Sequence, residues 1–107
     1  MKTVGFDHTD FNSEENFKKL LNLLNLNETP SLGTSGGFTY QNNDIKLITL
    51  YNPLTGVRYD KNKSTHDLGF SGYIGLEGNS KSVKLAESFI LNNTDYKDHN
   101  PTEREFI

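Results

Sequence analysis

Cysteine and tryptophan are both absent from this chain of 107 residues, and only three prolines interrupt it. The lack of cysteine excludes a disulfide framework, thiolate metal sites and cysteine nucleophiles, and it fits a reducing compartment. No apolar run approaches the length of a bilayer span, and the N-terminus lacks the apolar stretch of a signal peptide. We therefore expect a soluble, intracellular protein of the cytoplasm that does not contact membranes.

Basic residues are also few, since 11 Lys and Arg stand against 14 Asp and Glu and give a net charge of −3. Binding to nucleic acid regardless of sequence requires clustered Lys and Arg that neutralise phosphates. The chain has no basic stripe, so nucleic acid is not an expected partner. Hydrophobic residues make up 33% of the chain and the mean hydropathy is −0.67. These values predict one small domain over residues 1–107, with a modest core and a polar surface.

Two segments carry apolar residues at helical spacing, and we expect a helix in each. The first should span about 13–26, with Asn12 as its N-cap and Glu15 at the capping-box position three residues on. The second should span about 79–93. The expected apolar faces comprise Phe17, Leu20, Leu21 and Leu24 in the first helix and Val83, Leu85, Ala86, Phe89 and Ile90 in the second.

Strands are expected between and before these helices. The predicted strands cover residues 3–7, about 38–40, 45–51, 57–59 and 69–77. The turn at 52–56 should place Gly56 at positive φ. This order predicts an α+β fold, a mainly antiparallel sheet of four to five strands with both helices on one face. A ferredoxin-like variant would need a final strand from the polar C-terminal tail, residues 94–107, for which the signal is weak. Both a tail docked through Phe106 and Ile107 and a free tail remain open.

Four glycines at a spacing of three, Gly69, Gly72, Gly75 and Gly78, precede the second helix. One hypothesis is a bent or bulged strand. The other is a close approach of backbone, partner or ligand to Gly72 and Gly75, with Gly78 serving the turn into the helix. A further alternative function is a small-ligand domain, in which an anionic, nucleotide-like ligand would bind at the helix N-terminus beside the glycine-rich strand. The residues expected to hold it are Gly78, Asn79, Ser80 and Lys81.

Aromatic residues fall in or beside the predicted strands, and alternation should place some of them on the sheet face that the helices leave open. A protein-binding surface there would comprise Tyr40, Tyr51, Tyr59, Phe70, Gly72, Tyr73 and Gly75. The competing interpretation is that most of these rings belong to the core or to cross-strand pairs.

Three histidines, His8, His66 and His99, each have an aspartate nearby, which suggests a hydrolase as a further hypothesis. Their spacing matches no helical metal motif, so we assign no catalytic residue, no metal and no cofactor. The leading hypothesis is a small acidic binding or regulatory protein that acts through a protein surface, for example as an inhibitor of a larger protein. The sequence leaves its oligomeric state open.

Overall fold

The computed structural model describes residues 1–7, 9–11, 13–31, 37–58, 73–94 and 102–105. Seven strands and two helices lie in these segments. In chain order they are β1 (Lys2–Asp7), α1 (Glu14–Leu23), β2 (Phe38–Gln41), β3 (Ile45–Thr49), β4 (Tyr51–Asn52), β5 (Val57–Arg58), β6 (Tyr73–Gly78), α2 (Ser80–Asn93) and β7 (Thr102–Glu105).

Five strands form one antiparallel sheet in the order β2-β3-β6-β1-β7, and β4 and β5 pair separately. β1 and β3 run parallel with β6 between them, and the chain passes from β1 through α1 toward β3. In the same way, β6 and β7 run parallel with β1 between them, and the chain passes from β6 through α2 to β7. Two such interleaved units make the ferredoxin-like arrangement, to which β2 adds an edge strand. The predicted α+β class is confirmed, and the weak tail signal corresponds to β7.

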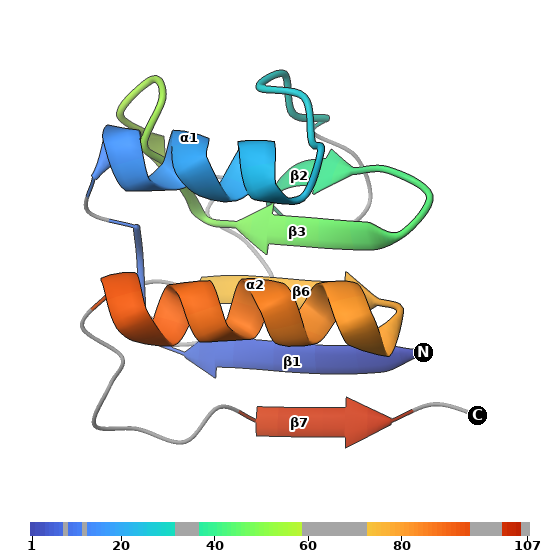
Figure 1. Cartoon of the computed structure of the whole chain (residues 1–107). Helices are drawn as coiled ribbons and strands as arrows, with labels where there is room; N and C mark the ends of the chain where they lie inside the picture. The colour runs from blue at the N-terminus through green and yellow to red at the C-terminus, as the bar shows by residue number, and fades with distance from the viewer. Residues whose placement is uncertain (8, 12, 32–36, 59–72, 95–101, 106–107) are drawn as a thin grey trace.

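Both helices lie on one face of the sheet, α1 over β2 and β3 and α2 over β6 and β1 (Figure 1). Alternation along the strands explains this, because each strand turns every second side chain toward the helices. Seven of the nine residues predicted for the apolar helix faces are buried in a single cluster, and Phe89 is partly buried against it; the seven are Phe17, Leu20, Leu21, Leu24, Val83, Ala86 and Ile90. Leu85, also predicted for the buried face, is 44% exposed, because the buried side chains of α2 occupy a narrower stripe than the sequence suggested.

Each helix begins at a side-chain cap. The Ser13 hydroxyl accepts a hydrogen bond from the backbone N–H of Asn16 at 3.1 Å, so the predicted N-cap at Asn12 is wrong by one residue. Asn79 caps α2 in the same way, accepting from the N–H of Ser82 at 2.8 Å. Such caps satisfy N–H groups that have no partner within the helix.

α1 ends at Leu23, three residues before the predicted end. Asn25 adopts a left-handed φ of 58°, and the N–H of Leu26 donates back to the carbonyl of Leu21 at 2.8 Å. This is the hydrogen bond of a Schellman ending, in which the two flanking apolar side chains also meet. Leu21 and Leu26 are both buried, so the ending turns the chain away from the helix and toward β2.

The predicted strand over 45–51 is divided in the structure, because β3 ends at Thr49 and β4 pairs with β5 instead. The turn between β4 and β5 is held by Asn52. Its carbonyl accepts from the N–H of Gly56 at 2.8 Å, and its side chain accepts from the N–H of Leu54 at 2.9 Å. Gly56 has a φ of 74°, which confirms the predicted positive φ.

Candidate functional site

On the sheet face opposite the helices, the ring of Tyr73 lies across two glycines. A Cβ built on Gly75 would be 2.8 Å from the Cε2 of Tyr73, and one on Gly5 would be 3.0 Å from its Oη. Gly5 and Gly75 are cross-strand partners in β1 and β6, so one ring covers both. A side chain of the same strand therefore takes the space over Gly75 that one of the two hypotheses assigned to an approaching backbone, partner or ligand. Gly69 and Gly72 lie outside the described residues.

The close backbone approach occurs at Gly78 instead. A Cβ there would collide with the carbonyl oxygen of Asp44 and would lie 2.8 Å from the Cα of Ile45. The N–H of Asn79 donates to the same Asp44 carbonyl at 3.0 Å. Gly78 thus permits the start of β3 to pack against the strand–helix turn, consistent with its predicted role in that turn.

The N-terminus of α2, the predicted anion site, already has a carboxylate beside it. The Nδ2 of Asn79 donates to the Oδ1 of Asp44 at 3.4 Å, while Ser80 and Lys81 are exposed. A helix N-terminus favours negative charge, and Asp44 supplies that charge from within the chain. This arrangement weakens the attraction of the turn for an external anion.

Tyr40 belongs to the core and not to an open aromatic surface. It is 1% exposed, and its ring meets Phe17 of α1 edge to face at a centroid distance of 5.2 Å. Burial raises the pKa of Tyr40 to about 12, and the negative charge of Glu28 adds to this shift. The predicted surface position is wrong because Tyr40, like Phe38 two residues earlier, points to the helix-covered face.

The other predicted site residues are only partly within the described segments. Tyr51 is half-buried in β4. Tyr59 and Phe70 lie outside the described residues, as do all three histidines, His8, His66 and His99. Within the part of the chain that the structure describes, no cluster of three metal-ligating side chains is present. The hydrolase hypothesis therefore has no described geometry to support it.

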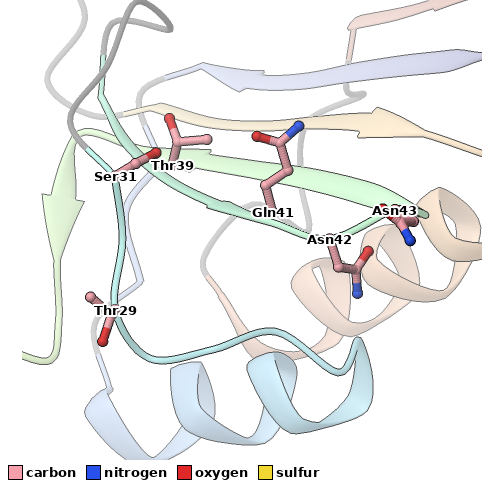
Figure 2. Close-up of a pocket in the computed structure, with 6 residues that line it drawn as sticks. All are labelled: Thr29, Ser31, Thr39, Gln41, Asn42 and Asn43. Atoms are coloured by element: carbon pink, nitrogen blue, oxygen red, sulfur yellow. The ribbon is translucent and has the colours of Figure 1, made fainter.

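An open groove of about 420 Å³ runs along the outer edge of β2, between this strand and the segment that connects it to α1 (Figure 2). It is lined by Thr29, Ser31, Thr39, Gln41, Asn42 and Asn43. Every one of these side chains carries a hydroxyl or an amide and none is charged, so the groove offers hydrogen bonds without electrostatic attraction.

Asn42 is the groove residue that the fold itself uses. Its Nδ2 donates to the carbonyl of Leu24 at 2.8 Å and to that of Asn25 at 3.3 Å. Its Oδ1 accepts from the N–H groups of Asp44 at 2.8 Å and Ile45 at 3.0 Å. The amide therefore joins the end of α1 to the β2–β3 turn and fixes one wall of the groove.

Four of the other five lining side chains have hydrogen-bonding groups that the described structure does not use. The exception is Thr39, which donates its hydroxyl to the Gly37 carbonyl at 3.4 Å and is 5% exposed. The other four are exposed and make no hydrogen bond within the described residues; they belong to Thr29, Ser31, Gln41 and Asn43. These groups are solvated in the free protein and available to a ligand.

Sequence reasoning missed this groove. The segment 31–37 reads as a plain loop and 42–44 as turn chemistry, and nothing in the sequence marks β2 as an edge strand. The usable signal is compositional, because hydroxyl and amide residues flank both ends of the short strand. Only the strand order shows that they face the same edge.

In comparisons with known proteins, no family model, no curated protein and no solved structure matches this chain. Neither α1 nor α2 has the length and apolarity that crossing a bilayer requires.

Proposed function

We propose that this protein is a binding protein that holds a segment of a partner protein in the groove at the β2 edge. The observation that carries the proposal is the set of four uncharged side chains, from Thr29, Ser31, Gln41 and Asn43, whose hydrogen-bonding groups are unused within the described residues. Interfaces of this polar kind gain specificity from groups that must find a matching donor or acceptor.

The chemistry of the lining favours binding over catalysis. A hydroxyl nucleophile such as Ser31 needs an adjacent base to activate it. The six lining residues include no carboxylate, imidazole or amine. The net charge of −3 favours a partner whose surface around the bound segment is basic, as expected for a small regulatory protein acting on a larger one.

The proposal is tested by selecting a phage-displayed library of random peptides on the purified full chain. The affinities of the selected peptides are then compared for two variants, Asn43→Lys in the groove and Asn22→Lys on the exposed face of α1. We expect Asn43→Lys to weaken binding by about tenfold or more, which is the loss of roughly one good interaction. Asn22→Lys should leave binding unchanged.

Thermal unfolding of both variants controls for stability, because both replace an exposed asparagine with the same side chain. If no selected peptide distinguishes Asn43→Lys from Asn22→Lys, the groove is not the binding surface and the proposal is wrong.

A further inference from the structure

One half of the outer edge of β2 is occupied by the chain itself. The N–H of Thr39 donates to the carbonyl of Ser31 at 3.0 Å, and the N–H of Ser31 donates to the carbonyl of Thr39 at 2.9 Å. These two bonds form an isolated antiparallel bridge. They show that Thr39 directs both of its backbone groups away from β3, toward the outer edge.

The other half of this edge is open. Residues two apart in a strand direct their backbone groups to the same edge, so the N–H and carbonyl of Gln41 also face outward. In a continued antiparallel ladder, Thr29 would pair with Gln41, since Ser31 pairs with Thr39. No such bridge forms, and both residues instead line the groove. Gln41 makes no hydrogen bond at this edge within the described residues.

We propose that the occupant of the groove is an extended, uncharged peptide segment that pairs with the backbone of Gln41, a proposal that rests on the binding function above. One residue of this segment accepts from the N–H of Gln41 and donates to its carbonyl. The segment thereby adds to the sheet edge next to Ser31, which already shows this mode of pairing. Strand addition of this kind draws affinity from backbone bonds and specificity from the flanking side chains.

The lining determines the chemistry of the side chains in the bound segment. A charged group would lose hydration on entering the groove and would meet no opposite charge among the six lining residues. Hydroxyl and amide side chains, however, can pair with Thr29, Asn43 and the amide of Gln41. We therefore expect Ser, Thr, Asn and Gln at the positions beside the paired residue.

The edge pairing is tested with the groove-dependent peptides from the display experiment and two substitutions at one position. Gln41→Pro removes the outward N–H, and proline is tolerated on a strand edge where that N–H has no partner in the sheet. Gln41→Ala keeps the N–H and removes only the side-chain amide. We expect Gln41→Pro to weaken binding about tenfold or more beyond the loss in Gln41→Ala, because proline removes the backbone donor as well as the side-chain amide.

A second measurement requires no protein variant. N-methylation of the peptide at each position in turn should weaken binding to the unaltered chain at a single position, that of the paired residue. In ¹⁵N-resolved NMR spectra, the Gln41 amide should shift and exchange more slowly with solvent when the unmethylated peptide binds.

Three outcomes would overturn the proposal in different ways. In the first, Gln41→Ala abolishes binding, Gln41→Pro binds no worse than Gln41→Ala, and N-methylation of the peptide has no effect. This result would show that the peptide contacts only the side chain of Gln41, and it would leave the binding function standing. Peptides rich in Lys, Arg, Asp or Glu at the flanking positions would refute the uncharged occupant. A shift of the Gln41 amide by maltose, with no groove-dependent peptide selected, would assign the groove to carbohydrate and refute the protein-binding function as well.

Discussion

β2 borders two regions in which a polar group without a hydrogen-bond partner has opposite consequences. Toward α1 it contributes Phe38 and Tyr40 to the buried core, and along its outer edge it contributes Gln41 to the groove. The hydroxyl of Tyr40 is buried and has no partner among the described residues. The side chain of Gln41 also has none, but it is exposed to solvent.

The difference lies in what water can do. An unpaired polar group in the core loses its hydration and lowers stability, whereas one at the surface remains hydrated at no cost until a ligand replaces the water. An unused donor or acceptor therefore indicates a binding site only on the exposed side of β2. Truncation of a buried apolar side chain should lower stability and leave binding intact, whereas a substitution at Thr29, Ser31, Gln41 or Asn43 should weaken binding and leave stability intact.

The largest effect is expected in the core beneath α1. Leu21 is 1% exposed, and Leu21→Ala should lower the free energy of unfolding by about 2–5 kcal/mol through lost burial and the cavity left behind. Leu23, two residues later, is 44% exposed, so Leu23→Ala should change it by no more than about 0.5 kcal/mol. Urea unfolding measures both. Equal losses would mean that α1 presents a different face to the sheet.

The two glycines of β6 give the next largest contrast. In Gly78→Ala the new methyl group meets backbone atoms of Asp44 and Ile45, which cannot move without displacing β3. We expect a loss of about 1–3 kcal/mol, the usual range for overpacking. In Gly75→Ala the methyl group meets the ring of Tyr73, a side chain that can rotate away, so the loss should be smaller. A larger loss at Gly75, measured by urea unfolding, would reverse the roles assigned to these glycines.

Much of the core, but little of the candidate site, could be predicted from the sequence. The spacing of Leu20 and Leu21 identified the buried face of α1 because apolar periodicity is a local signal. Tyr40 was misplaced because its face depends on which side of β2 the helices cover, and that is set by distant segments. The groove depends on strand order, which brings Ser31 to the β2 edge and leaves Gln41 open. No local pattern encodes that order.

Asn42 and Asn43 are adjacent groove residues, and they should separate stability from binding. Asn42→Ala removes four hydrogen bonds and leaves the carbonyl of Leu24 without its side-chain donor. We expect it to lower the free energy of unfolding by about 1 kcal/mol, the low end for unsatisfied groups because the site is partly exposed. Asn43→Ala should stay within about 0.5 kcal/mol, since its side chain makes no hydrogen bond in the described structure. Thermal and urea unfolding measure both variants. If the two variants are equally stable, the Asn42 amide does not fix the wall of the groove.

The smallest effect at neutral pH, and one of opposite sign, is expected for Tyr40→Phe. Removing a buried hydroxyl that has no partner among the described residues should leave stability unchanged or raise it by about 0.5 kcal/mol.

The pH dependence of stability gives a sharper test of the Tyr40 hydroxyl. The folded-state pKa of Tyr40 is raised from 10.0 to about 12, so the folded protein keeps this proton where the unfolded chain loses it. The resulting stability is fully present below pH 10 and is lost as the pH rises from 10 to about 12. In Tyr40→Phe that part of the decline should disappear. The free energy of unfolding of both proteins is measured across this pH range. If the two values fall in parallel, the Tyr40 hydroxyl is not held in the core.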